Sequence, residues 1–382
     1  MAYALLGWYA FLQAAPGVVV VHLREELHLG YTASGVHVAG FAAGSLVAGV
    51  VAPALERRIS RFHLLWGGVA VMGFGALVLA AGRVPAVTAS GVVVMGVGGG
   101  LLLTTVQSSL ADHHGEGRTV ALAEANAVAS VAYLLLLGGM AMAAALAWGW
   151  RSCLLAWLVL GVVLWWTNRG LPVPSAPAVA GVDSGRLPGL FWLVLGLLFC
   201  TVAAEWCVVS WSATYVDVHT TASADTAVVV MAGYFGGVLV GRFVVSRLAS
   251  RHPPAWLLAG ALAVALAGFL VLEAAGTPVV AAVGLVLLGL GIGNLYPMGL
   301  ALAVSVGADR AGQASALVVA VGAAAALVVP FTVGALADAI TLPSAMLAVP
   351  VLLVAAVVAL GILLWRMPRR SDPQAAVVRG RA

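Results

Sequence analysis

Charged residues are scarce in this chain of 382 residues, and lysine is absent altogether. Asp, Glu and Arg make up 8% of the residues, whereas a water-soluble domain carries about 25% charged residues. Hydrophobic residues make up 63%, and the mean hydropathy is +1.10. The composition therefore excludes a soluble globular domain and indicates a multi-pass membrane protein. We attribute the net charge of +4 to membrane topology and lipid headgroup contact, and we expect no nucleic-acid partner.

Cysteine is scarce as well. The chain has three, Cys153, Cys200 and Cys207, and an odd number in or beside apolar runs gives neither a disulfide framework nor a metal-binding spacing. A nucleotide-binding loop is also lacking, so we expect no cofactor and no direct coupling to ATP. No basic segment precedes the first apolar run, which we therefore interpret as an uncleaved first span rather than a signal peptide.

Long apolar runs, by contrast, are abundant. Twelve are long enough to cross roughly 30 Å of hydrocarbon as helices. Their continuous apolarity favours helices over barrel strands, which alternate in polarity every second residue. The runs lie at about 3–23, 34–54, 64–82, 87–111, 119–146, 152–168, 190–214, 225–246, 255–274, 279–304, 314–336 and 344–365. The sequence therefore predicts an all-α membrane protein with twelve transmembrane helices.

The chain contains an internal repeat at a constant offset of 193 residues, as from Gly40 to Gly233. The same offset relates Gly44 to Gly237, Arg58 to Arg251, and Gly96, Gly98 and Gly100 to Gly289, Gly291 and Gly293. A tandem repeat in a chain this apolar is typical of a transporter built from two halves. We expect two pseudo-symmetric six-helix bundles at 1–168 and 190–366, a Pro- and Gly-rich cytoplasmic linker at 169–189, and a cytoplasmic tail at 367–382.

The arginines predict the orientation in the membrane. If the N-terminus is cytoplasmic, fifteen of the eighteen arginines lie on the inner side, and only Arg24, Arg83 and Arg151 lie outside. Cytoplasmic loops carry such an excess of basic residues. We therefore expect both termini in the cytoplasm and the protein in a plasma membrane, such as the inner membrane of a bacterium.

Two arginine-rich loops, after the second span (40–61) and the eighth (233–251), carry a family resemblance. Together with twelve spans and a long loop after the sixth, they resemble the major facilitator superfamily. The family's loop motif runs roughly Gly, then Asp, Arg, a variable residue, Gly, Arg and Arg. Here Glu56 stands for the Asp and Arg57 for the first Arg, while Ile59 and Ser60 depart from the pattern. The stretch 205–216, followed by GYFGGVLVGR, is similar to the fucose-permease-like branch.

The resemblance implies that spans one, four, seven and ten line a central cavity, which two rocking halves expose to either side in turn. All four spans carry polar side chains that fit this role. We expect a small-molecule substrate to meet the polar and aromatic residues of these spans. The candidate cavity residues are Tyr9, Gln13, Thr104, Gln107, Glu205, Trp206, Trp211 and Asn294.

Glu205 is the sharpest candidate, because an ionised carboxylate near the bilayer midplane is costly unless it is paired or hydrated. We hypothesise that Glu205 binds the coupling proton, or directly binds a cationic or hydroxyl-bearing substrate. The alternative is a permanently protonated Glu205 that is hydrogen-bonded within the bundle. Trp206 and Trp211 are interpreted as a stacking wall for a sugar or another ring-bearing solute, or else as packing residues.

The loop residues and two charges at matching depth form the expected inner gate. Glu124 lies near the inner end of span five and Arg242 near that of span eight, and the two spans meet across the halves in the family resembled. An ion pair between them would latch the inner gate when the transporter faces outward. Glu124 has two alternative roles, in coupling or as a snorkelling surface residue. The remaining gate candidates are Glu56, Arg57, Arg58, Arg61, Arg247 and Arg251.

Two further sets of residues carry packing predictions. Asn126, Ser130 and Tyr133 share another face of span five and are candidates for the cavity or for interhelical hydrogen bonds. Small residues every four positions, Gly40 and Gly44 in span two and Gly233, Gly237 and Gly241 in span eight, let helix backbones approach closely. We expect these glycines to form smooth surfaces between the moving halves.

Particular residues disfavour other classes of function. A membrane enzyme would need a cluster such as Asp112, His113, His114 and Glu116, but two adjacent histidines do not share a helix face. We therefore expect no enzyme and no metal site. A receptor or scaffold is disfavoured by polar stripes on four spans. A drug/proton antiporter is the main alternative, although 132–146 in span five has paired glycines without the Pro typical of that group.

The sequence thus predicts a secondary active transporter that moves a small neutral or cationic solute by proton-coupled alternating access. The absence of a deep arginine to bind an anion favours neutral and cationic solutes. We expect a monomer whose partners are the solute, the coupling proton and membrane lipid.

Overall fold

The computed structural model describes residues 1–114, 118–171, 173, 186–249, 251–307 and 310–366. These residues form helices and connecting turns, and no strand occurs among them. Among the described residues, twelve helical segments are long and apolar enough to cross a membrane, as expected from the sequence. The helices are α1 (Ala2–Leu27), α2 (Tyr31–Glu56), α3 (Arg61–Ala81), α4 (Pro85–His114), α5 (Arg118–Ala145), α6 (Trp150–Asn168), α7 (Gly189–His219), α8 (Ala224–Leu248), α9 (Pro254–Glu273), α10 (Pro278–Ile292), α11 (Leu295–Val306), α12 (Ala311–Ala339), α13 (Leu342–Met346) and α14 (Ala348–Arg366).

Two of the twelve spans are interrupted. The tenth breaks between α10 and α11 at Gly293 and Asn294, and the twelfth between α13 and α14 at Leu347. Pro297 gives the first break a cause, because it has no N–H group to bond the carbonyl of Gly293 one turn earlier. The sequence-based span of 279–304 ran through this point, since uniform apolarity hides a local loss of one backbone hydrogen bond.

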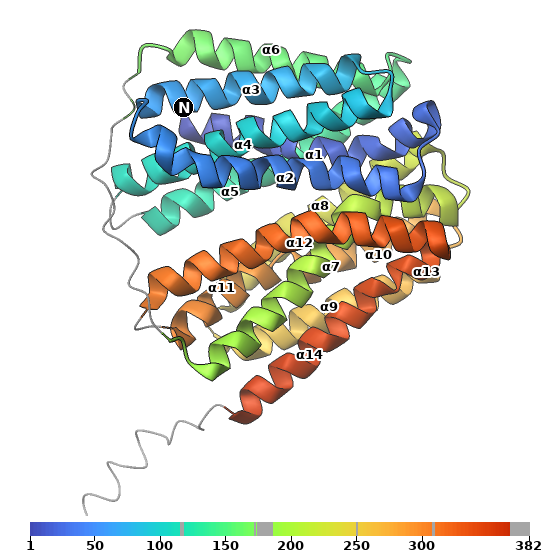
Figure 1. The fold of residues 1–382 in the computed structure, drawn as a ribbon. Coiled ribbons are helices and arrows are strands. Elements are labelled where there is room, and N and C mark those ends of the chain that lie inside the picture. Colours follow the sequence, from blue (N-terminus) through green and yellow to red (C-terminus); the bar gives the residue numbers. More distant parts are fainter. Residues whose placement is uncertain (115–117, 172, 174–185, 250, 308–309, 367–382) are drawn as a thin grey trace, which may run out of the picture.

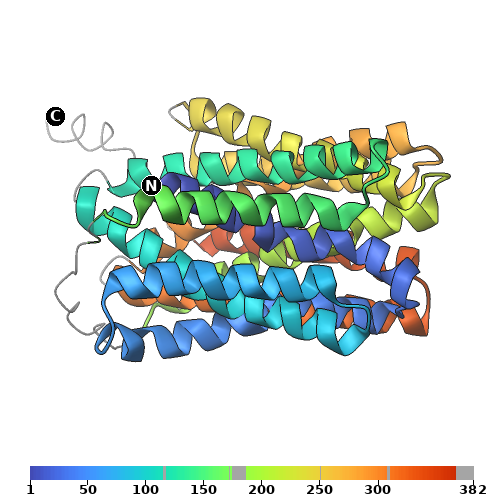
Figure 2. The same cartoon turned by 90° about the horizontal axis from the view of Figure 1, so that it is seen from above.

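The internal repeat reappears in the helix boundaries. α2, α3, α4 and α5 begin at residues 31, 61, 85 and 118, and α8, α9, α10 and α12 begin at residues 224, 254, 278 and 311. Each pair of starts differs by the same 193 residues that relate the glycines. Figure 1 shows the corresponding groups, α1–α6 above and α7–α14 below, with the helices running along a common direction in both views (Figures 1 and 2).

The repeated glycines pack helices together inside each half. A Cβ atom on Gly96 would overlap the backbone of Phe41 in α2, and one on Gly98 would overlap Met72 in α3. Their repeat partners behave alike, because a Cβ atom on Gly289 would overlap Tyr234 in α8, and one on Gly291 would overlap Ala261 in α9. The expected close packing is therefore present.

One expectation about glycine is wrong. Gly44 faces Val93 and Gly96 of α4, and Gly237 faces Val286 and Leu290 of α10, so these stripes lie within the halves and not between them. Gly40 likewise faces α4, and Gly233 and Gly241 face α10. Small-residue spacing identifies a close helix contact, but it does not identify which neighbouring helix is contacted.

The two halves meet mainly where α2 packs on α12 and α5 packs on α8. Near the start of α2, Gly35 lies against Pro330 and Phe331, and the carbonyl of Tyr31 lies against Gly334. This end of the bundle, opposite the end where α1 begins, is called the far side below; the end where α1 begins is the N-terminal side. The ribbons of the two halves converge on the far side and diverge towards the N-terminus (Figure 1).

Candidate functional site

A group of polar side chains lies between the halves, where α1, α5, α7 and α8 approach one another. The Tyr133 hydroxyl of α5 donates a hydrogen bond to Gln13 Oε1 of α1 at 3.1 Å. The Tyr133 ring packs against the Phe235 ring of α8, with centroids 5.0 Å apart. Tyr133 therefore links a predicted cavity residue of the first half to the surface of the second half.

Arg242 of α8 reaches across to the same face of α5. Its Nη1 donates to Ser130 Oγ at 2.5 Å and to the Asn126 carbonyl at 3.3 Å. Ser130 and Tyr133 thus make the interhelical hydrogen bonds expected of that face. Two acceptors hold one edge of the guanidinium group, and such charge-assisted bonds are stronger than bonds between neutral groups.

Glu205 lies near the middle of α7 and is partly buried. Its carboxyl group is close enough to interact electrostatically with Arg242 and with the hydroxyl groups of Tyr133, Tyr234 and Tyr296. It nevertheless makes no hydrogen bond or ion pair with any residue in the described part of the chain. A partly accessible carboxyl group with no hydrogen-bond partner among the described residues can take up a proton or bind a solute group.

The neighbours of Glu205 include groups that the sequence interpretation did not connect with it. The hydroxyl of Tyr234 is buried and has no hydrogen-bond partner in the described ranges. Arg242 was assigned from sequence to the inner gate alone, on its depth in span eight. Its proximity to Glu205 depends on how α8 packs against α7, and a one-dimensional pattern does not encode this packing.

The other predicted cavity residues differ in their burial and in their hydrogen bonds. Asn294 is 3% exposed at the break in the tenth span, where its Nδ2 donates to the Leu290 carbonyl at 3.4 Å. Thr104 donates within its own helix to the Gly100 carbonyl at 2.9 Å. Thr104 and Gln107 are exposed, Trp206 is partly buried and Tyr9 is buried.

Trp211 lies apart from this group. It is fully buried on the far side, where its ring is 6.1 Å from the Tyr31 ring of α2 and its edge touches Gly334 of α12. Its indole N–H has no hydrogen-bond partner within the part of the chain that the structure describes. Trp211 therefore contributes to the contact between α2, α7 and α12, six residues along the helix from Glu205.

The predicted gate residues lie at the N-terminal side. Glu124 accepts a hydrogen bond from the Tyr3 hydroxyl at 2.7 Å, and Arg61 pairs with Asp112 at 2.6 Å. The latch between Glu124 and Arg242 was expected when the N-terminal side closes, and it stays a prediction for that state. Glu56, Arg57, Arg58, Arg247 and Arg251 are exposed.

The enzyme alternative concerned the cluster that includes Asp112. This carboxylate is engaged with Arg61, and the His113 and His114 rings pack edge to face with centroids 5.0 Å apart. Glu116 lies outside the described residues. Within the ranges that the structure describes, no group of three or more His, Cys, Asp or Glu side chains is placed to hold a metal ion.

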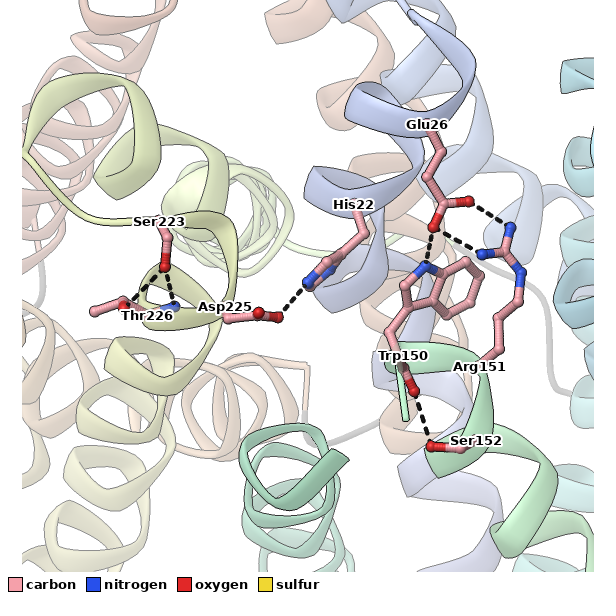
Figure 3. Close-up of polar contacts among 9 residues, drawn as sticks. His22, Glu26, Trp150, Arg151, Ser152, Ser223, Asp225 and Thr226 are labelled. Atoms are coloured by element: carbon pink, nitrogen blue, oxygen red, sulfur yellow. Dashed lines mark hydrogen bonds and ion pairs between the residues drawn. The ribbon is translucent and has the colours of Figure 1, made fainter. Parts of the chain in front are cut away.

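The far side carries charged contacts between the halves that the sequence interpretation missed. His22 Nε2 of α1 lies 2.9 Å from Asp225 Oδ1 of α8, with side chains 11% and 59% exposed (Figure 3). Asp338 of α12 accepts hydrogen bonds from the backbone N–H groups of Tyr31 and Thr32. Charged residues at span ends were a visible signal, but partners more than 200 residues apart were not.

The far end of α1 is also fixed to its own half. Glu26 accepts hydrogen bonds from Trp150 Nε1 at 2.8 Å and Arg151 Nη1 at 2.7 Å, and both donors lie in the first turn of α6 (Figure 3). Arg151 Nε donates to the Ala80 carbonyl at the end of α3. Glu26 thus joins three helices of the first half, one turn from His22, which contacts the second half.

Comparison with known proteins supplies a family and a fold. The model of the Major Facilitator Superfamily matches residues 2–330 and 194–382. No curated protein sequence is significantly similar to the chain.

Solved structures of transporters share the fold along nearly the whole chain. A bacterial homolog of the human lysosomal transporter Spinster, inward-facing and occupied, has a TM-score of 0.75 at 16% identity, covering 97% of each chain. The nucleoside transporter NupG has a TM-score of 0.75 at 11% identity, covering 96% of this chain and 100% of its own. The E. coli fucose:proton symporter FucP has a TM-score of 0.60 at 19% identity, covering 94% and 98%.

Proposed function

Because this chain belongs to the Major Facilitator Superfamily and is a multi-pass membrane transporter, we propose that it is a proton-coupled secondary transporter that works by alternating access. Its solute is small and net neutral or cationic. Following the arginine distribution, we place both termini in the cytoplasm and the far side outside the cell. The closed far side then corresponds to an inward-facing state, in which the site between the halves is reached from the cytoplasm.

One observation carries the proposal: Glu205 is a mid-membrane carboxyl group without a hydrogen-bond partner among the described residues, close to the charge of Arg242. An unpaired charge at this depth is costly, and such residues commonly serve a transport pathway. A proton that binds Glu205 removes its negative charge while Arg242 keeps its contacts with α5. The charge balance between α7, α8 and α5 therefore changes with proton binding, at the point where the halves meet.

The chemistry of the surrounding side chains supports a hydrophilic, uncharged or zwitterionic solute. Arg242 offsets the charge of Glu205, which favours a net neutral solute over a strongly cationic one. Gln13 and the hydroxyl groups of Tyr133 and Tyr234 offer hydrogen bonds, and Phe235 offers an apolar surface. Among the structures with this fold, FucP is a fucose:proton symporter and NupG a nucleoside transporter. Sugars and nucleosides are thus the first solutes to screen.

The test has two stages. Purified protein is screened by thermal shift against sugars, nucleosides, amino acids and lipophilic cations, and radiolabelled hits are then measured in proteoliposomes with an imposed pH gradient. We expect an inward-directed proton gradient to drive accumulation. Accumulation driven only by an outward-directed gradient identifies the drug/proton antiporter instead, and transport indifferent to both gradients contradicts proton coupling.

Glu205→Gln provides the residue-level arm of the test. Without an ionisable group at this position, gradient-driven accumulation should fall to the level seen without a gradient, while solute exchange between the two sides persists. Glu25→Gln, an exposed carboxylate at the end of α1, is the matched control and should accumulate solute like the parent. If Glu205→Gln keeps full gradient-driven accumulation, Glu205 is not the coupling site.

A further inference from the structure

The helix α2 begins without a side-chain cap from its own sequence. Its N-cap residue is Gly30, which has no side chain to accept a hydrogen bond from the first turn. The backbone N–H groups of Tyr31 and Thr32 donate instead to Asp338 Oδ1 at 2.9 Å and Oδ2 at 2.8 Å. Asp338 belongs to α12, so the second half of the protein supplies the cap for a helix of the first half.

The repeat-related helix α8 is capped differently. The offset of 193 residues that pairs Tyr31 with Ala224 also pairs Gly30 with Ser223. Ser223 is the N-cap of α8, and its Oγ accepts from the Thr226 N–H at 3.3 Å (Figure 3). One copy of the repeat therefore carries a local cap, and the other depends on a residue about 300 positions away in the chain.

The Asp338 cap lies inside the contact that closes the far side. The Arg24 guanidinium stacks on the Tyr31 ring at 3.8 Å, and its charge acts on both Asp338 and Asp217 of the second half. The carbonyl of Tyr31 lies against Gly334, one turn before Asp338. Any movement that separates α2 from α12 on this side must break both bonds to Asp338.

We propose that Asp338 is a conditional helix cap: it satisfies the start of α2 only while the far side is closed, and it thereby favours that state. In the open state the first N–H groups of α2 lose this cap, and the free energy lost with it opposes opening. The proposal rests on the two halves moving as proposed above, but it depends neither on the identity of the solute nor on proton coupling. The His22–Asp225 contact acts in the same direction.

The test measures how often the far side opens. Cys153, Cys200 and Cys207 are replaced by Ala, and Ser210→Cys is introduced as a reporter, because Ser210 is fully buried where α7 meets Gly17 of α1. A membrane-impermeant maleimide is added from the far side of oriented vesicles. Loss of a helix cap typically changes an equilibrium about two- to thirtyfold, so Asp338→Ala should raise the labelling rate within that range.

Gly30→Ser guards against an Asp338 variant that simply misfolds. Gly30 has ordinary extended backbone angles (φ −66°, ψ 168°), and the atom nearest to a Cβ there would be Asp338 Oδ2 at 3.4 Å, an ordinary contact. A serine would cap α2 locally in both states and remove the penalty for opening. We expect faster labelling in Gly30→Ser, and a smaller effect of Asp338→Ala in the Gly30→Ser background.

The matched control is Ser223→Gly in α8. Its cap is local and is lost in both states alike, so its thermal stability should fall while the labelling rate stays at the parent value. The proposal is overturned if Asp338→Ala and Gly30→Ser label at the parent rate, or if Ser223→Gly accelerates labelling as much as Gly30→Ser. A failed proton-coupling experiment leaves these labelling rates unaffected, so the two proposals fail separately.

Discussion

At the scale of single residues, the candidate site and the far side are built from contacts that cross between the halves. Arg242 with Ser130, His22 with Asp225, and Asp338 with the start of α2 each join residues more than 100 positions apart. The sequence indicated Glu205, Gln13 and Arg242 as functional, because polar groups within apolar spans are costly. It did not indicate their partners, since helix periodicity fixes the face of a residue and not the neighbour that this face meets.

The contact between Arg242 and Ser130 leads to a stability prediction. Ser130→Ala removes one of the two acceptors of Arg242 and should destabilise the protein by about 0.6 kcal/mol, the average for an interhelical hydrogen bond in a membrane, and by no more than about 1.7 kcal/mol. The measurement is the midpoint of thermal unfolding in detergent. Ser152→Ala is the control, because the Ser152 hydroxyl donates only to Gly149 at the start of its own helix. Equal losses in both variants would argue against a special role for the contact between the halves.

At the scale of helices, the sequence was more informative. Twelve apolar runs and a constant repeat offset predicted the spans and their pairing, because spanning the bilayer requires length and continuous apolarity, which are one-dimensional properties. The break at Gly293 and the packing partners of Gly44 and Gly237 were not predicted. These features depend on one missing N–H group and on the direction in which each helix tilts.

The packing glycines permit a prediction at this scale. A methyl group on Gly96 overlaps the Phe41 backbone, so Gly96→Ala should force α4 away from α2 and cost about 1 to 3 kcal/mol. Gly49→Ala is the control, since nothing lies within 4 Å of its Cβ position, and it should be neutral or stabilising. The measurement is the midpoint of thermal unfolding of both variants and the parent protein. A Gly96→Ala protein as stable as the parent would contradict the close contact of α4 with α2.

At the scale of the whole molecule, the contacts that hold the two similar halves together differ between the far side and the region near Glu205. Far-side contacts include the His22–Asp225 contact, a helix cap and closely packed glycines, whereas Arg242 and Tyr133 make the contacts near Glu205. The repeat predicted the existence of two halves. The repeat could not predict the difference between the far-side contacts and those near Glu205. Residues that differ between the two copies, such as Gly30 and Ser223, create this difference.

A covalent link across the far side should therefore stop the transport cycle. His22→Cys combined with Asp225→Cys, in a background without the native cysteines, places one thiol on each half at positions whose native side chains lie 2.9 Å apart. After treatment with a bifunctional methanethiosulfonate cross-linker we expect solute exchange to cease, and a reducing agent should restore it. Each single cysteine variant, treated in the same way, is the control. Undiminished exchange by the fully cross-linked protein would show that the far side need not open.

If the two halves move as proposed, the far end of α1 marks where they separate. Hydrogen bonds hold Glu26 to α6, while His22, a single turn earlier, contacts α8. The boundary between the two halves therefore passes along two successive turns of α1. The outermost turn, which carries Glu26, stays attached to the first half. A drug-sized molecule bound at His22 would separate the two halves, whereas the same molecule bound at Glu26 would only weaken contacts within the first half.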